Sequence, residues 1–192
     1  METAELLETI ARGEDSRHQF KSDVTNATAL GAEIVAFANA KGGQIFIGIA
    51  DNGTPQPLSA AGVRRLNELI ANASANCVRP SINPLSENVP VSGGVVMVVT
   101  ILEGLNKPYM DNTGAIWVKS GSDKRRITSR EEMQRMFQAM QLIHADDVPV
   151  PGSSAADIDL TYFAAFFQSR FGQALEEQQL SLAQILCNMR LV

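Results

Sequence analysis

The segment from residue 33 to residue 53, EIVAFANAKGGQIFIGIADNG, constrains the fold more than any other part of the chain. Its first third carries apolar residues at helical spacing, and the glycine pair that follows supplies the positive φ that a helix C-terminus favours. The near-continuous apolar run from Ile45 to Ile49 predicts a strand that is covered on both faces. The triplet Asp51-Asn52-Gly53 then predicts a tight turn, because these residue types tolerate left-handed backbone. A helix, a turn and a buried strand therefore form one unit.

Further helices and strands are predicted on both sides of this unit. The segment Thr3–Arg12 predicts a short helix with an inward apolar face made of Leu6, Leu7 and Ile10. The segment GEDSRHQFKS after it is too polar for the core. It predicts an edge strand whose side chains face a cleft. The other predicted elements are a helix capped by Thr25 or Asn26, a helix over 60–77 capped by Ser59, strands over 93–102 and 115–119, and a helix that begins with a capping box of Ser129 and Glu132. These patterns indicate a mixed α/β (α+β) fold for residues 1–145, with a mixed sheet flanked by helices.

Residues 146–192 differ in composition from the rest of the chain. The sequence DDVPVPGSSAADID over 146–159 is typical of a linker. Two helices are predicted after it, over 160–171 and over 177–189, and the first carries an aromatic stripe that predicts a small core. The stripe consists of Phe163, Phe166, Phe167 and Phe171. Because the segment 160–192 ends abruptly on an apolar pair, we expect it to be a truncated second domain.

Composition excludes several classes of protein. The N-terminus is acidic and amphipathic, which excludes a secretory signal, and the longest apolar run is far too short to cross a bilayer. Cys77 and Cys187 match no metal or redox spacing, so we expect a reduced, cytoplasmic protein without a membrane partner. The net charge is −5, but residues 146–192 hold two basic and six acidic residues. Residues 1–145 are therefore nearly neutral, which leaves room for a local basic face.

A dense basic cluster lies within residues 119–130. Gly121 and Ser122 interrupt it, which predicts a flexible loop that can follow a phosphate backbone. Such a cluster attracts phosphates without needing a particular base sequence, although clustered charges are often only a solvated turn. The members of the cluster are Lys119, Lys124, Arg125, Arg126 and Arg130.

Other side chains are candidates for the same cleft. The predicted edge strand brings further basic residues, and one more basic residue follows the helix over 60–77; these candidate phosphate contacts are Arg17, His18, Lys21 and Arg79. Single surface charges are common, which is the alternative interpretation for each of them. Tyr109 and Trp117 are candidates for stacking on bases, but a Trp within a strand more often belongs to the core.

Several motifs in combination resemble a known family. They are EDSRHQFK from Glu14, AFANAKGGQIFIGIADNG from Ala36, KPYM from Lys107, IWVKSGS from Ile116 and TSREEM from Thr128. Over residues 8–140 this combination resembles the Schlafen AlbA-type domain. The resemblance implies a DNA-binding module at the N-terminus of bacterial proteins called transcriptional regulators or divergent AAA-type ATPases. The sequence from 157 onward is similar to the region that follows this domain in the longer regulators, which implies a winged-helix-like part.

The resemblance also implies an alternative chemistry. In the nuclease members of the Schlafen family, two acidic residues five apart and a third after the glycine-turn strand bind a divalent ion that supports RNA cleavage. Hard cations need such anionic oxygen ligands. The matching positions here are Glu14, Gln19 and either Ala50 or Asp51. Because Gln19 is neutral, the acidic site is incomplete, and Glu14 and Asp51 are alternatively a solvated residue and a turn residue.

Three other activities lack their sequence patterns. No G-x-x-x-x-G-K-[ST] phosphate loop occurs, so the sequence gives no support for ATP hydrolysis. Two segments resemble the ATP-binding boxes of histidine kinases, but they occur in the wrong order. His18 and His144 lack zinc-binding partners at suitable spacing. We therefore expect a module that binds DNA or RNA through the basic residues named above, acts by positioning and needs no cofactor. The alternatives are a metal-dependent endoribonuclease, which would need a divalent metal, and a protein-interaction or homo-oligomerisation module.

Overall fold

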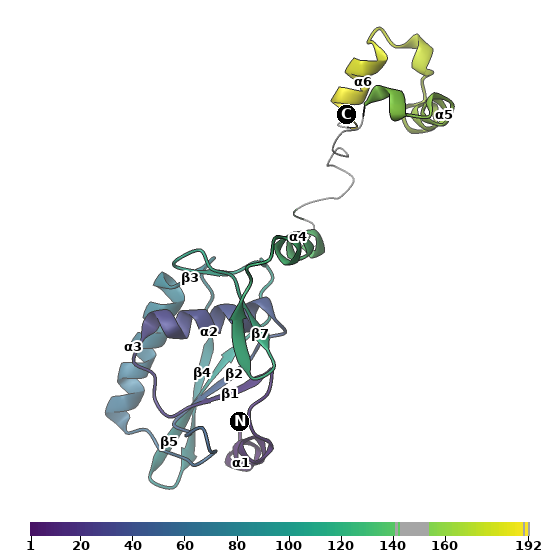
Figure 1. Ribbon diagram of the computed structural model, residues 1–192. Coiled ribbons are helices and arrows are strands. Elements are labelled where there is room, and N and C mark those ends of the chain that lie inside the picture. Colours follow the sequence, from purple (N-terminus) through teal and green to yellow (C-terminus); the bar gives the residue numbers. More distant parts are fainter. Residues whose placement is uncertain (141, 143–153, 190, 192) are drawn as a thin grey trace. The chain divides into compact units, whose positions relative to one another are not determined.

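The structure of the chain is a computed structural model that describes residues 1–140, 142, 154–189 and 191 (Figure 1). The chain divides into two compact units, Met1–Met140 and Gln141–Val192, and each is described by itself. Two features of the sequence, His144 and most of the predicted linker over 146–159, lie outside the described residues.

A four-stranded mixed sheet forms the centre of the first unit. Its strand order is β1 (His18–Lys21), β2 (Gly43–Ile47), β5 (Gly94–Ile101) and β4 (Leu85–Val91). Strands β1 and β2 are parallel, whereas β2 pairs with β5 and β5 with β4 in antiparallel fashion. The mixed sheet is confirmed, and the polar segment before residue 22 does form an edge strand. Gln19 and Phe20 of that strand are nevertheless buried, so the segment is not too polar for the core.

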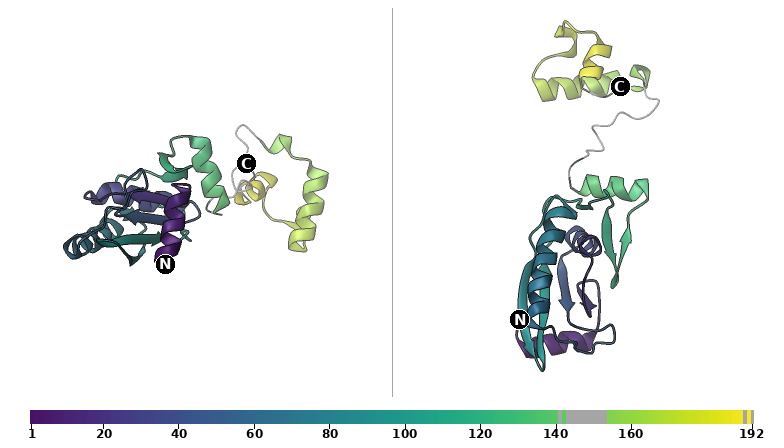
Figure 2. Two further views of the ribbon diagram at one scale, coloured as in Figure 1. Left: turned by 90° about the horizontal axis from the view of Figure 1, so that it is seen from below. Right: turned by 90° about the vertical axis from the view of Figure 1, so that its left-hand side faces the viewer.

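Helices cover both faces of this sheet (Figures 1 and 2). Helices α2 (Ala27–Asn39) and α3 (Ala60–Asn76) pack on one face, and α1 (Thr3–Arg12) packs on the other. The central strand β2 alternates between them, because Ile45 and Ile47 join the core under α2 while Phe46 joins Leu6 of α1 on the opposite face. Burial on both faces is confirmed for this strand. The predicted inward position of Leu7 is wrong, since its side chain is 52% exposed.

The ends of these elements follow the predicted local chemistry. The side chains of Asn26 and Ser59 cap α2 and α3, each accepting a hydrogen bond from a backbone N–H three residues later. Gly42 follows α2 with a φ of +71°, and a Cβ there would lie 2.6 Å from the carbonyl oxygen of Ile101, so this position requires glycine. Strand β2 ends at Ile47, two residues earlier than predicted, because the backbone of Gly48 turns to a φ of +103°.

A β-hairpin lies against α2 beside the sheet. Its strands β7 (Trp117–Ser120) and β8 (Asp123–Arg126) are joined by the two residues Gly121 and Ser122. The prediction of a flexible loop over 119–130 is wrong, because a two-residue turn closes a paired antiparallel ladder here. Helix α4 (Arg130–Ala139) follows, and a short pair of strands, β3 (Val78–Arg79) and β6 (Met110–Asp111), completes the unit.

The second unit is a small helical assembly. It contains α5 (Leu160–Phe171), α6 (Leu182–Asn188) and two short 3-10 helices, η2 (Ala155–Asp157) and η3 (Leu175–Glu177). Only half of the predicted aromatic stripe is core: Phe163 and Phe167 are buried, whereas Phe166 and Phe171 are 43% and 52% exposed. Helix α6 starts five residues later than predicted. Within the described residues of both units, no helix is long and apolar enough to cross a membrane.

Candidate nucleic-acid interface

The hairpin directs two of its lysines into the domain. Lys119 and Lys124 are cross-strand partners, and the Lys119 ammonium lies 3.3 Å from Oε1 of Gln19 and 4.7 Å from the centre of the Phe37 ring. The Lys124 ammonium donates to Oε1 of Glu33 at 2.5 Å. Burial lowers the pKa of Lys119, and the nearby carboxylates of Glu33 and Glu14 partly oppose this shift. Both lysines therefore hold the hairpin on α2 and β1.

A buried polar cluster explains why these lysines point inward. Residues Gln19 and Lys21 of β1 lie opposite Ile45 and Ile47 in the parallel register, so they share the face of the sheet that α2 covers. Glu33 of α2 is buried on that side. A buried carboxylate needs a positive partner, and the hairpin supplies it. The other carboxylate oxygen of Glu33 has no hydrogen-bond partner among the described residues.

Arg125 is also engaged within the domain. Its guanidinium forms two parallel hydrogen bonds with the carboxylate of Glu132, in the first turn of α4. These bonds raise the pKa of Arg125 and lower the pKa of Glu132. The predicted capping box is therefore only half formed: Ser129 accepts the N–H of Glu132, but the Glu132 side chain joins the hairpin to α4 instead of returning to the cap.

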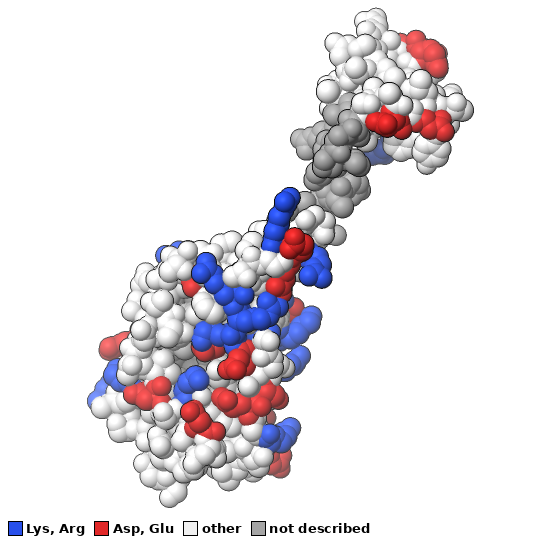
Figure 3. Space-filling model, viewed as in Figure 1, with Lys and Arg blue, Asp and Glu red and all other residues white. Residues whose placement is uncertain are grey.

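Four of the predicted basic residues remain free of internal partners. Within the described part of the chain, none of their side chains forms a hydrogen bond or an ion pair, and they are Arg17, Lys21, Arg126 and Arg130. All but Lys21 are exposed, and Lys21 lines a pocket of about 230 Å³ with Asp23 and Glu33. Figure 3 shows Lys and Arg side chains gathered over the hairpin and α4, with acidic side chains among them and below them.

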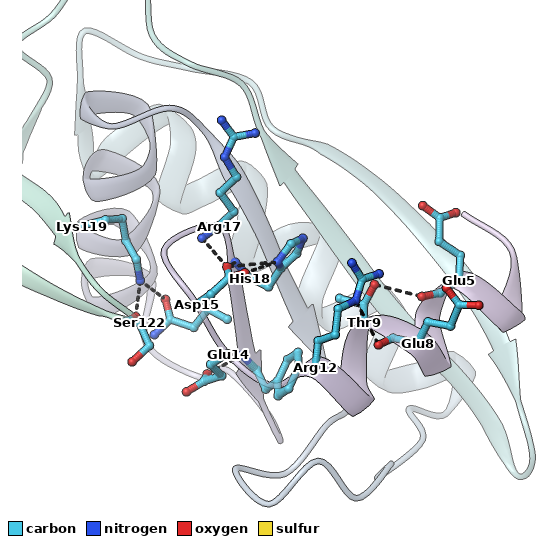
Figure 4. A network of polar contacts seen from close by, with 12 residues as sticks. Glu5, Glu8, Thr9, Arg12, Glu14, Asp15, Arg17, His18, Lys119 and Ser122 are labelled. Atoms are coloured by element: carbon cyan, nitrogen blue, oxygen red, sulfur yellow. Dashed lines mark hydrogen bonds and ion pairs between the residues drawn. The ribbon is translucent and has the colours of Figure 1, made fainter.

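The segment before β1 separates Arg17 from the buried cluster (Figure 4). Asp15 accepts hydrogen bonds from the backbone N–H groups of Arg17 and His18 and from the His18 ring. Partial burial would raise the pKa of Asp15, but these hydrogen bonds outweigh it and lower the pKa. The Arg17 guanidinium extends away from Lys119 and Glu14. Arg79 instead bonds to the carbonyls of Ala75 and Val78, so its guanidinium is used locally.

The predicted acidic site does not assemble in the described residues. Glu14 accepts the backbone N–H of Phe20 at 2.6 Å, and Asp51 is an exposed turn residue. Across the described ranges, no group of three or more His, Cys, Asp or Glu side chains could hold a metal ion. The ammonium of Lys119 lies 3.3 Å from the side-chain oxygen of Gln19, so its positive charge would repel a metal cation bound there. The residues present therefore do not fit a divalent-metal centre.

The aromatic candidates have structural roles. Tyr109 is buried, and Trp117 donates its indole N–H to Asp111 at 2.7 Å. The buried Asn39 holds both of their segments: its Oδ1 accepts the N–H of Tyr109, and its Nδ2 donates to the carbonyls of Tyr109 and Trp117. Local patterns do not predict this clamp, although the AFAN motif at the end of the predicted helix contains Asn39.

Residues 14–128 match the model of the family described as Schlafen, AlbA_2. No curated protein matches the chain. The DIP2311 protein from Corynebacterium diphtheriae has a similar structure, with a TM-score of 0.53 and 17% identity, covering 91% of this chain and 39% of its own. The chain thus spans about two fifths of that protein, and the likeness shows the fold alone.

A second solved structure is the N-terminal domain of the "Putative ATP-dependent DNA Helicase RecG-related Protein" from Nitrosomonas europaea. Its TM-score is 0.45 at 20% identity, and the match covers 68% of this chain and 96% of that domain.

Proposed function

Because the chain belongs to the Schlafen, AlbA_2 family, we propose that its first unit is a nucleic-acid-binding module of a bacterial-type transcriptional regulator. The family match supports a nucleic-acid-associated domain. The observation that carries the proposal is the pair of exposed arginines Arg126 and Arg130, which flank the junction of β8 and α4 and have no internal partner in the described part of the unit. Their charge is therefore available to an external anion.

The surrounding charge favours phosphate. Residues 117–135 contain six Lys or Arg against three Asp or Glu, although the whole chain is acidic. Arginine donates in a planar fork that suits phosphate oxygens, and each contact releases condensed counterions from the nucleic acid. In this proposal Arg126, Arg130, Arg17 and Lys21 contact the phosphate backbone. Lys119, Lys124 and Arg125 hold the hairpin that presents these contacts.

The module works by positioning in this proposal. Phosphate contacts fix the register and orientation of a protein on nucleic acid without reading its sequence. No cofactor is needed for such contacts. A two-residue turn closes the hairpin that carries Arg126, and Lys124 fastens this hairpin to α2. The Arg125–Glu132 pair joins it to α4, which carries Arg130.

Salt-dependent binding tests the proposal. The double variant Arg126→Gln with Arg130→Gln should bind duplex DNA more weakly, and the slope of log K against log salt should become shallower by roughly 1.8, because each lost phosphate contact removes about 0.9. Fluorescence anisotropy over several salt concentrations measures both quantities.

A matched control carries the same change in charge elsewhere. Arg12 on α1 and Arg64 on α3 are exposed and lie on elements away from the hairpin, so Arg12→Gln with Arg64→Gln should leave the slope close to that of the wild type (Figure 1). Equal slopes for the two double variants, or no binding by the wild type at low salt, would refute the proposal.

A further inference from the structure

A groove of about 540 Å³ lies between the C-terminal end of α2, the hairpin and α4. Its volume is in the range of sites that hold small organic ligands. It adjoins the candidate interface, because Arg125 of β8 lines its wall. The groove is not predictable from local sequence patterns, since it depends on how α4 packs beside the hairpin.

The inner surface of the groove is largely apolar. Val118 of β7, Ile127 after β8 and Met136 of α4 line it, and Ala139 and Met140 continue the same surface along α4. Ile127 is almost fully buried, whereas the other side chains are partly open to solvent. Methionine is flexible and polarisable, so it adapts to flat unsaturated rings. This surface therefore suits a planar apolar group.

Positive charge surrounds that surface. The lining of the groove contains four basic side chains and one carboxylate. The carboxylate is that of Glu132, which Arg125 already neutralises. The basic side chains are those of Lys107, Lys119, Arg125 and Arg135. Lys107 donates to the carbonyl of Ala40 and to Glu103 at 2.7 Å each. Arg135 is exposed and forms no hydrogen bond or ion pair with other described residues. A complementary ligand combines a flat ring with an anionic group close to it.

We propose that this groove seats a base of single-stranded nucleic acid, with the adjoining phosphate at Arg135. The inference rests on the proposed function and adds a substrate class to it. Bases of a duplex are stacked inside the helix, so they cannot enter the groove beside Met136, whereas bases of a single strand are free to leave the stack. The module then holds the backbone through Arg126 and Arg130 and a base through the groove.

Abasic oligonucleotides separate the base from the phosphate. The full chain is titrated by fluorescence anisotropy with a strand of twelve thymidylates and with an abasic strand of the same length. The wild type should bind the thymidylate strand about fivefold more tightly, no more than the smallest contribution of a base stacked on an aromatic ring, because aliphatic side chains and methionine line the groove. Met136→Gln should abolish this preference while leaving the affinity for the abasic strand unchanged. Met133→Gln, on the same helix but outside the groove lining, should retain it.

The outcomes separate the two proposals. Equal affinity of the wild type for both strands refutes the groove but leaves the phosphate contacts standing. Absence of binding to either strand and to duplex refutes both. A preference that survives Met136→Gln places the base elsewhere and refutes the groove. Tighter binding of an acidic peptide than of either strand refutes nucleic acid as the ligand of the groove.

Photocrosslinking of the wild type provides a measurement that does not depend on a variant's folding. A strand with one 4-thiothymidine should crosslink to peptides containing Val118 or Met136, located by mass spectrometry. Crosslinks confined to peptides outside 107–140 would overturn the inference.

Discussion

Asn39 offers the sharpest test of how the candidate interface is held. Its side chain is 7% exposed and makes three hydrogen bonds to backbone, with distances of 2.7 Å from the Tyr109 N–H and 2.9 Å and 2.8 Å to the carbonyls of Tyr109 and Trp117. It thereby joins the end of α2 to the segment before β6 and to the first strand of the hairpin. Asn39→Ala removes all three bonds and leaves buried backbone groups without partners.

The size of the effect follows from these bonds. Each buried hydrogen bond contributes about 1 kcal/mol net, so three amount to about 3 kcal/mol of the free energy of unfolding. With an m-value of about 2 kcal/mol/M, the urea midpoint should fall by roughly 1.5 M. The melting temperature should fall by about 10 °C for a unit of this size.

The assay uses the only tryptophan of the chain. Trp117 accepts one of the three bonds, so its fluorescence reports the unfolding of the hairpin region directly. Asn67→Ala is the matched control, because Asn67 is exposed on α3 and forms no hydrogen bond within the described residues. Its free energy of unfolding should stay within about 0.5 kcal/mol of that of the wild type. A loss below about 1 kcal/mol for Asn39→Ala would refute the clamp.

Two further predictions concern the same framework. Gly42→Ala should destabilise the unit by at least about 2 kcal/mol, because it combines a positive φ with a Cβ 2.6 Å from the Ile101 carbonyl oxygen. Gly114 has a φ of +79° and open space around it, so Gly114→Ala is the control and should lose only the backbone strain of about 1 kcal/mol. The same urea titration measures both variants. Burial would raise the pKa of Asp111, but hydrogen bonds from Thr113, Trp117 and Ala115 outweigh it and lower the pKa. This carboxylate therefore stabilises the fold at a pH above its unfolded pKa. The stabilisation is lost as the pH falls through the lower folded pKa. Trp117 fluorescence should show stability decreasing below about pH 4, and Asp111→Asn should flatten that decrease; an identical acid profile would contradict the assignment.

Local patterns were sufficient to predict most of the elements. Three kinds of feature depend on only a few neighbouring residues, and each is confirmed. They are the helix caps Asn26 and Ser59, the glycine after α2 and the buried strand β2. Errors arose where tertiary packing decides. Leu7 faces solvent because α1 buries only a narrow stripe against the sheet. Most of the predicted loop over 119–130 belongs to a hairpin, because α2 and β1 supply partners that lie far away in sequence.

The candidate site was harder to predict than the fold, for an electrostatic reason. Sequence alone gives the density of charge, but not whether a given cation already has a partner. The sequence predicts five phosphate contacts within 119–130, and the structure divides them. Lys119 bonds to Gln19, and Lys124 and Arg125 are paired with Glu33 and Glu132. Among the described residues, Arg126 and Arg130 have no partner. The acidic partner of Lys124 lies 91 residues away and that of Arg125 lies seven residues away. The first separation is beyond any local pattern.

This division changes how binding data on this domain should be interpreted. Replacing Lys124 leaves the buried carboxylate of Glu33 without its positive partner, a loss that strongly destabilises buried ion pairs in general. Such a variant would lose nucleic-acid binding by loosening the hairpin, and the loss would resemble that of a direct phosphate contact. The salt slope separates the two cases, because a contact at Arg126 contributes to counterion release whereas a support at Lys124 does not. A Lys124→Met variant that binds weakly with an unchanged slope and altered Trp117 fluorescence would identify a support, and a shallower slope with unchanged fluorescence would identify a contact.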